Sequence, residues 1–203
     1  MERGTLEPRL IEKLLTINSF SRPGRRLAEC RGIILHYVGK PNQRAQSVWN
    51  FFEKDIPRSK RHSSAHYIID LNGDIYRAVP DNEVAFHCGS STLDPATGSV
   101  YTDWARRKFG RFVSDPTKNS PNNCTIGIEL CIDPNKNFPT ETLNSAVWLV
   151  AKLVRENKLT TEDIGHHKLV VGWKDCPLPW VREPELFEKF KEKVRSRLGV
   201  FVQ

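Results

Sequence analysis

One loop near the C-terminal end of the chain carries two histidines, a lysine and a cysteine. It reads Gly-His-His-Lys from residue 165 and ends at Cys176-Pro177, with a second lysine at residue 174. Imidazole nitrogen and thiolate sulfur are ligands that zinc prefers, and a catalytic zinc site keeps three protein ligands with a fourth position open. One histidine of the pair and Cys176 would supply two of these ligands. A third ligand must come from elsewhere in the chain.

The best source of the third ligand is His36. It ends the apolar run Gly32-Ile33-Ile34-Leu35, which is typical of a buried β-strand. Such a strand would place the polar ring at its end, where a site can form. The alternative is a core histidine whose ring nitrogens find ordinary hydrogen-bond partners.

Four segments with the same order of polar residues resemble one known family, the zinc-dependent N-acetylmuramoyl-L-alanine amidases, which also includes phage amidase endolysins and peptidoglycan recognition proteins. The segments are the strand ending in His36, the strand 64–70 with its Asn72-Gly73 turn, the strand 126–130 and the loop 166–177. The resemblance covers roughly residues 30–182 and is carried by the four segments together. It implies an enzyme with Zn²⁺ as cofactor and peptidoglycan or muropeptides as partners. The expected reaction is hydrolysis of the amide between the lactyl group of N-acetylmuramic acid and L-alanine.

The resemblance also proposes the metal ligands. The Gly165-His166 pair is similar to the Gly-His that opens this loop in family members, so the expected ligands are His36, His166 and Cys176, although the spacing of the residues does not by itself separate His166 from His167. His66 matches a family histidine that is not a ligand, which implies a structural role. His87 resembles a position near the substrate groove, and Tyr37 is assigned to the same groove. Plain packing is the alternative for His87.

Two charged residues are the candidates for catalysis. A lysine occupies the position of Lys174 in family members, where its ammonium would stabilise a developing oxyanion. Glu129 would be an inward carboxylate beside zinc that takes a proton from water and returns it to the amine. Some phage amidases use a tyrosine where this chain has Ala65, so the proton transfer is expected to rest on Glu129. The alternatives are a solvated Lys174 and a structural ion pair for Glu129.

Composition agrees with an ordinary globular protein. The chain has 203 residues, of which 38% are hydrophobic and 27% charged, and no stretch is long enough to span a bilayer. Charged residues near the start argue against a signal peptide, so we expect synthesis in the cytoplasm and action on the cell wall after release, or on cytoplasmic muropeptides. The net charge of +7 is scattered without a stacking pattern of aromatic residues, which argues against nucleic acid. The five cysteines are an odd number and show no disulfide pattern. Separately, we expect a monomer.

The periodicity of apolar residues predicts an α/β fold. Residues 1–30 are expected to be a leader with one short helix, and residues 31–203 the amidase catalytic domain. Within that domain we expect a helix at 42–54 capped by Asn42, a hairpin of strands 65–71 and 75–79, a long substrate-side loop at 89–123, a strand at 125–132, a helix from Thr140 to about Asn157 and a helix from Pro184. Together they predict a single domain with a central mixed β-sheet flanked by helices, and a zinc site at one edge of the strand ends.

Two other functions are compatible with parts of this pattern. A non-catalytic peptidoglycan-binding protein of the same fold would characteristically lack the cysteine ligand, which is present here. A purely structural zinc site would need four protein ligands, and the sequence offers no evident fourth.

Overall fold

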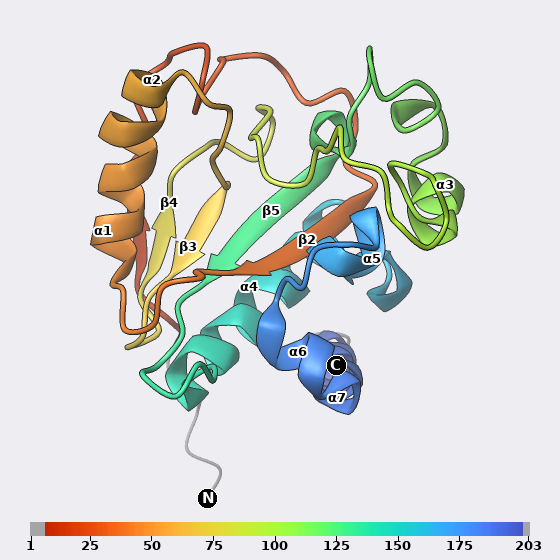
Figure 1. Cartoon of the computed structure of the whole chain (residues 1–203). Helices are drawn as coiled ribbons and strands as arrows, with labels where there is room; N and C mark the ends of the chain where they lie inside the picture. Colours follow the sequence, from red (N-terminus) through yellow and green to blue (C-terminus); the bar gives the residue numbers. More distant parts are fainter. Residues whose placement is uncertain (1–6, 201–203) are drawn as a thin grey trace, which may run out of the picture.

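A six-stranded mixed sheet forms the centre of the molecule (Figure 1). The computed structural model describes residues 7–200. The strand order is β1 (Leu10–Glu12), β4 (Ile75–Arg77), β3 (Tyr67–Ile69), β5 (Thr125–Leu130), β2 (Gly32–Tyr37) and β6 (Ile164–His166). Only β3 and β4 pair antiparallel; all other neighbours are parallel. The predicted fold, a single α/β domain with a mixed sheet, is confirmed.

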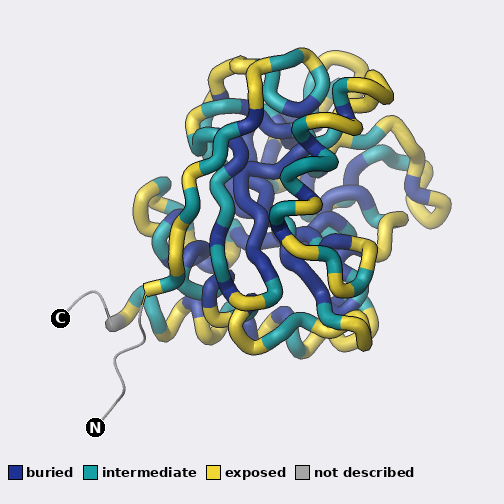
Figure 2. Tube along the Cα trace, turned by 90° about the vertical axis from the view of Figure 1, so that its left-hand side faces the viewer, coloured by how far each residue is buried: buried dark blue, intermediate teal, exposed yellow. Residues whose placement is uncertain are grey.

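Helices cover both faces of the sheet. One face packs against α4 (Thr140–Glu156), α6 (Leu178–Arg182) and α7 (Pro184–Val200). The other face carries α1 (Ala45–Asn50), which continues through a π-helical turn at Phe51–Asp55 into α2 (Ile56–Ser59), and also α3 (Asp103–Phe109) and α5 (His167–Val171). Figure 2 shows the result: buried backbone runs through the centre, and the exposed segments lie in the outer turns.

Strand β2 is apolar on both faces because helices cover both of its faces. Ile33 and Leu35 pack toward α4 and α7, whereas Ile34 packs toward α3 and α5. Side chains alternate along a strand, so His36 shares the face of Ile34. In the parallel pairing with β5, His36 lies opposite Glu129. The register therefore brings these two polar side chains to the same face of the sheet.

The N-terminal segment differs from the prediction. Residues 1–6 lie outside the described part, but β1 extends the sheet beside β4, and Leu15 and Leu27 are buried. The short helix predicted within 1–30 is wrong for residues 7–30. A short isolated helix is marginal in water, whereas the edge of β4 offers this backbone hydrogen-bond partners.

The predicted helix at 42–54 is longer and begins differently. It runs through α1 and α2 to Ser59, beyond the predicted end at residue 54. Asn42 is not the cap; it adopts a left-handed conformation with φ 58°, and Arg44 holds the N-cap position without a side-chain capping bond. The carboxylate of Asp70 accepts from the Ala45 backbone N–H instead.

Other predicted elements are confirmed. The hairpin β3–β4 turns through Gly73 at φ +84°, a conformation that favours glycine. Strand β5 and helices α4 and α7 lie where expected, with Thr140 as the first helical residue of α4 after Pro139. The segment 89–123 is less irregular than expected, because it contains α3 and two short 3-10 turns.

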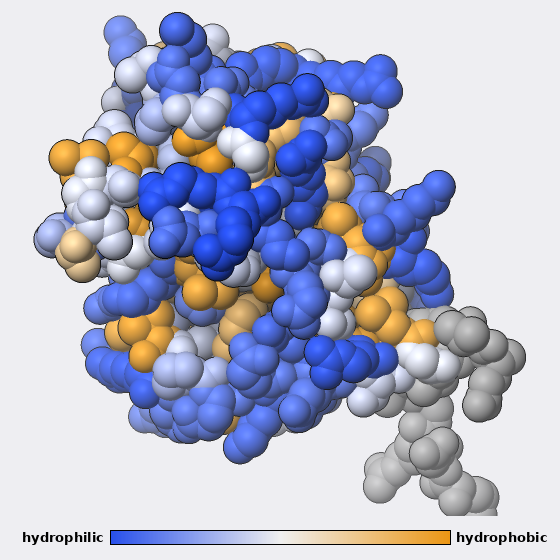
Figure 3. Space-filling view, turned by 90° about the vertical axis from the view of Figure 1, so that its right-hand side faces the viewer, coloured by the Kyte–Doolittle hydropathy of each residue, from blue (hydrophilic) through white to orange (hydrophobic). Residues whose placement is uncertain are grey.

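The surface is mostly hydrophilic with small apolar patches on the face seen in Figure 3. All five cysteines are free, and only Cys30 among them is less than fully buried, which agrees with the expected absence of a disulfide framework. No helix in residues 7–200 has the length and apolar character needed to cross a bilayer.

Asp70 ties the hairpin to the start of α1. Its carboxylate accepts from Arg44 Nε at 2.8 Å, from the Ala45 N–H at 3.1 Å and from the Leu71 N–H at 2.8 Å. Burial pushes the pKa of this carboxyl upward, but the hydrogen bonds from Arg44, Ala45 and Leu71 outweigh burial and leave the pKa below its ordinary value.

Replacing Asp70 with alanine should lower the free energy of unfolding by about 2–3 kcal/mol at neutral pH, because two backbone donors and a cation lose a charged acceptor. Arg44→Ala should cost under about 1 kcal/mol, since its side chain is more than half exposed and the backbone donors remain. A lowered acid pKa stabilises the fold above the unfolded pKa, and this contribution is lost as the pH falls through the folded pKa. The difference in free energy of unfolding between wild type and Asp70→Ala, measured by denaturant titration, should therefore become smaller in acid. Equal losses of free energy in Asp70→Ala and Arg44→Ala would contradict this role of Asp70.

Candidate metal centre and active site

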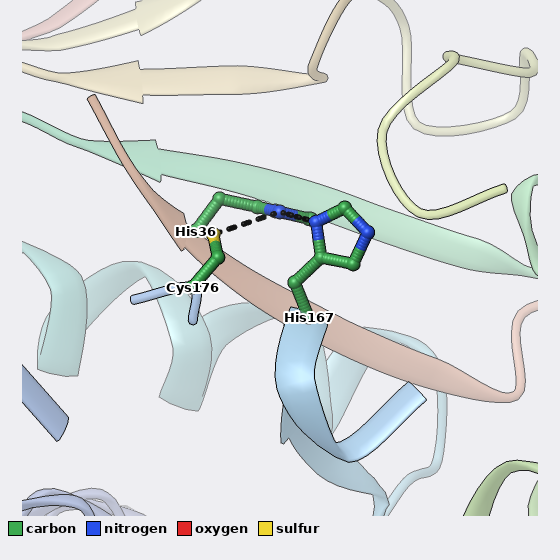
Figure 4. Close-up of side chains that lie close together, drawn as sticks. All are labelled: His36, His167 and Cys176. Carbon is green, nitrogen blue, oxygen red and sulfur yellow. Dashed lines mark hydrogen bonds between the residues drawn. The ribbon is translucent and has the colours of Figure 1, made fainter. Parts of the chain in front are cut away.

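Three side chains from distant parts of the chain meet at the carboxyl ends of β2 and β6 (Figure 4). His36 lies near the end of β2, His167 is the first residue of α5, and Cys176 follows α5 in the next loop. His36 Nδ1 lies 3.1 Å from His167 Nδ1 and 3.7 Å from Cys176 Sγ, and the three ligand atoms all lie within 4.8 Å of one another. All three residues are buried, with 2–4% of their surface exposed.

This donor set fits a zinc ion. Zinc–nitrogen and zinc–sulfur bond lengths in a tetrahedral site place neighbouring ligand atoms about 3.3–3.6 Å apart. The observed separations of 3.1 and 3.7 Å are close to those values. Two imidazoles and one thiol also leave one tetrahedral position open, which is the pattern of a catalytic rather than a structural site.

The structure does not support His166 as a ligand. In the pairing of β2 with β6, Leu35 lies opposite His166, so the His166 ring shares the face of Leu35 rather than that of His36. The ring packs on Phe187 of α7 at 4.8 Å between centroids, and its Nδ1 accepts from the Leu169 N–H at the start of α5. The group of side chains that could hold a metal therefore contains His167 rather than His166.

A sequence signal for His167 does exist, and it was missed. Alternation along β6 makes Ile164 and His166 share one face, and Ile164 belongs to the apolar core under α4 and α7. The next residue, His167, can turn to the opposite side, where His36 lies. The match to the family's Gly-His pair does not use this alternation.

Burial keeps the cluster neutral in the absence of a cation. Burial lowers the pKa of His167 to about 3, and the positive charge of Lys174 adds to that effect. The pKa of His36 is held well below its usual value by burial and by His167. Burial and the nearby Glu129 raise the pKa of the Cys176 thiol to about 12. Neutral imidazoles are ready to bind a metal, and the thiol must lose its proton to do so.

Glu129 is an acid held next to this cluster. It lies opposite His36 in the register of β2 and β5. Burial raises the pKa of Glu129 to about 8, although the nearby Lys174 charge works in the other direction. A carboxyl that titrates near neutral pH can both accept and return a proton.

One pocket borders the cluster, and a second borders Glu129. One, of about 330 Å³, is lined by His87, His167 and Lys174 together with polar residues of the 89–123 segment. The other, of about 390 Å³, is lined by Glu129, Tyr37 and the exposed Lys40, with the apolar Val48, Phe51 and Phe52. Lys174 thus lines the pocket that contains His167, whereas Glu129 and Tyr37 line the other pocket. A larger pocket of about 730 Å³ lies between α4, α6 and α7 and is lined by other residues.

His87 does more than line a pocket. Its Nδ1 lies 3.1 Å from His36 Nε2, and its Nε2 lies 3.2 Å from Thr125 Oγ1 and 3.3 Å from the Thr125 carbonyl oxygen. A Cβ on Gly127 would lie 2.4 Å from the His87 ring, so this ring rests directly on β5. His66, as expected, has a structural environment: Gly127 N–H donates to its Nδ1, and its Nε2 contacts the Glu83 carbonyl oxygen.

Comparison with known sequences identifies related proteins. The chain is 30% identical over 191 residues to a probable N-acetylmuramoyl-L-alanine amidase of Bacillus licheniformis, and 31% identical over 192 residues to the N-acetylmuramoyl-L-alanine amidase CwlL of the same species. Each match covers 94% of this chain and 48% of the relative. The chain thus spans about half the length of the curated relatives it matches.

Comparison with solved structures shows the same fold. The catalytic domain of XlyA superposes with a TM-score of 0.66 at 21% identity, covering 92% of this chain and 99% of that domain. The PlyG catalytic domain gives a TM-score of 0.67 at 16% identity, with 94% and 95% covered. The sequence profile of one family, described as N-acetylmuramoyl-L-alanine amidase, matches residues 26–179, which is most of the chain. On this evidence of sequence and fold, the chain belongs to the N-acetylmuramoyl-L-alanine amidase family.

Proposed function

We propose that this chain is a zinc-dependent N-acetylmuramoyl-L-alanine amidase that cleaves the amide between the lactyl group of N-acetylmuramic acid and L-alanine. The observation that carries the proposal is the buried cluster of His36, His167 and Cys176 beside the half-buried acid Glu129. Membership of the family supports the choice of bond. The substrate is peptidoglycan or a muropeptide derived from it, and a monomer stays a prediction.

The residues divide the work of amide hydrolysis among them. His36, His167 and Cys176 would hold zinc, which supplies an activated water and polarises the amide carbonyl. Glu129 takes the proton of the attacking water and returns it to the leaving amine, the two steps of general acid–base catalysis. Lys174 lines the pocket beside His167, from which its ammonium stabilises negative charge on the carbonyl oxygen.

The acids in the site favour an amide over a glycosidic bond. Glycoside hydrolysis commonly uses two carboxylates that flank the sugar bond. Of the residues that line the two pockets beside the cluster, Glu129 alone is acidic. The presence of Cys176 also argues against a protein of this fold that only binds peptidoglycan.

The ligand assignment predicts which histidine is needed for metal. His167→Ala should lose most of its bound zinc, because one of three ligands is gone, whereas His166→Ala should retain zinc near one ion per chain. Metal content measured after gel filtration, with a fluorescent chelator as a second readout, tests this. If His166→Ala loses zinc and His167→Ala keeps it, the assignment must be reversed.

Glu129→Gln should separate catalysis from stability. Its turnover should fall by about 100- to 10,000-fold with zinc retained, since the amide cannot relay the proton. In the metal-free protein the folded pKa of Glu129 is about 8 against an ordinary 4.5, so the unfolded chain ionises first and stability falls as the pH rises between these values. The variant should therefore melt at a higher temperature than wild type above pH 8, with the difference vanishing below pH 4.5. Unchanged turnover would remove Glu129 from the mechanism.

The products identify the bond. Digestion of purified peptidoglycan should release stem peptides that begin with a free L-alanine amino group and should leave the glycan strands intact. Labelling of new amino ends followed by mass spectrometry, with a parallel count of reducing sugars, measures both. The Glu129→Gln protein is the matched control. New reducing sugars without new L-alanine ends would refute the amidase assignment.

A further inference from the structure

The second imidazole nitrogen of His36 lies against His87, outside the cluster of His36, His167 and Cys176. His36 Nδ1 points into the cluster, while His36 Nε2 lies 3.1 Å from His87 Nδ1. The other nitrogen of His87 reaches Thr125. A continuous row of contacts therefore joins the proposed metal ligand to the backbone of β5.

The Pro121 carbonyl oxygen, at the end of this row, sets the direction of each hydrogen bond from Thr125 to His36. The Pro121 carbonyl oxygen can only accept, so the Thr125 hydroxyl donates to it, at 2.7 Å. Both Thr125 oxygens near His87, the hydroxyl and the carbonyl, are then acceptors. The proton between His87 and Thr125 consequently sits on His87 Nε2.

The position of the proton on His87 determines which ring nitrogen of His36 is protonated. In its neutral form the His87 ring carries a single proton, and its contacts with Thr125 place that proton on Nε2. His87 Nδ1 is then an acceptor, and His36 Nε2 must donate to it. The neutral His36 ring therefore keeps its Nδ1 lone pair free, and that nitrogen faces His167 and Cys176.

We propose that His87 is a positioning residue for the metal site, which selects the Nε2-protonated form of His36 and fixes the direction of its Nδ1 lone pair. Histidine ligands commonly donate their second ring N–H to an acceptor that orients them. Here the acceptor is another imidazole. Thr125 holds the His87 ring through its Nε2, and the Asn122 side-chain oxygen holds the His87 backbone by accepting from its N–H at 3.0 Å.

Gly127 helps to position the His87 ring. It shares the sheet face of Thr125 and Glu129 by alternation along β5, and it has no side chain where the His87 ring lies. Alanine at this position would place a Cβ 2.4 Å from the ring, closer than real contacts allow. Gly127→Ala thus keeps every polar group of the site but displaces the His87 ring.

Zinc affinity measured against a competing chelator tests the proposal, which rests on the proposed zinc site. His87→Ala should bind zinc about 10- to 100-fold more weakly than wild type. His87→Asn should recover most of that loss, because its side-chain oxygen can stand where His87 Nδ1 accepts. Gly127→Ala should weaken zinc binding in the same direction as His87→Ala. His62→Ala is the matched control: it removes an exposed imidazole that lines the same pocket as His87, and its zinc affinity should be unchanged.

The protonation pattern gives a second readout that needs no variant. Long-range proton–nitrogen NMR spectra of wild type labelled at histidine should show both His36 and His87 protonated at Nε2, with and without zinc. Undiminished zinc affinity in His87→Ala, or His36 protonated at Nδ1 in the zinc-loaded protein, would overturn the inference. A wild-type chain that binds no zinc would instead refute the proposed function itself.

Discussion

The parallel pairing of β2 with its two neighbours is the constraint on which the site depends. Register with β5 places His36 opposite Glu129, and register with β6 places Leu35 opposite His166. Because side chains alternate, these pairings put His36 and Glu129 on one face of the sheet and His166 on the other. A slip of one residue between β2 and β6 would exchange the faces. The apolar residues of these strands prevent that slip, since it would expose core side chains to the wrong layer.

Burial then determines the chemistry available at this face. It lowers the pKa values of the histidines and raises those of Cys176 and Glu129, so the groups favour their neutral forms until a cation is present. Such a site is costly to charge, and a thiolate within it would need a nearby positive charge. Lys174, by contrast, is exposed and lines one of the pockets.

The sequence-based predictions were right where local patterns carry the structure and wrong where distant groups decide it. The hairpin at Asn72-Gly73 and the long amphipathic helices α4 and α7 follow from turn chemistry and apolar periodicity. The start of α1 does not, because its capping group is Asp70, which lies 25 positions away from Ala45 along the chain. Likewise, residues 7–30 take their place from the edge of β4 rather than from their own helical preference.

The sequence by itself determined the residue types of the site, the strands that carry His36 and Glu129, and the family to which their order belongs. Only the tertiary structure decided that His167 joins His36 and Cys176, and that the ring of His87 lies on Gly127 and faces His36. The physical reason is the same in each case. Adjacent histidines have the same chemistry, and a ring has two usable nitrogens, so the choice depends on strand register and on hydrogen bonds between residues far apart in the chain.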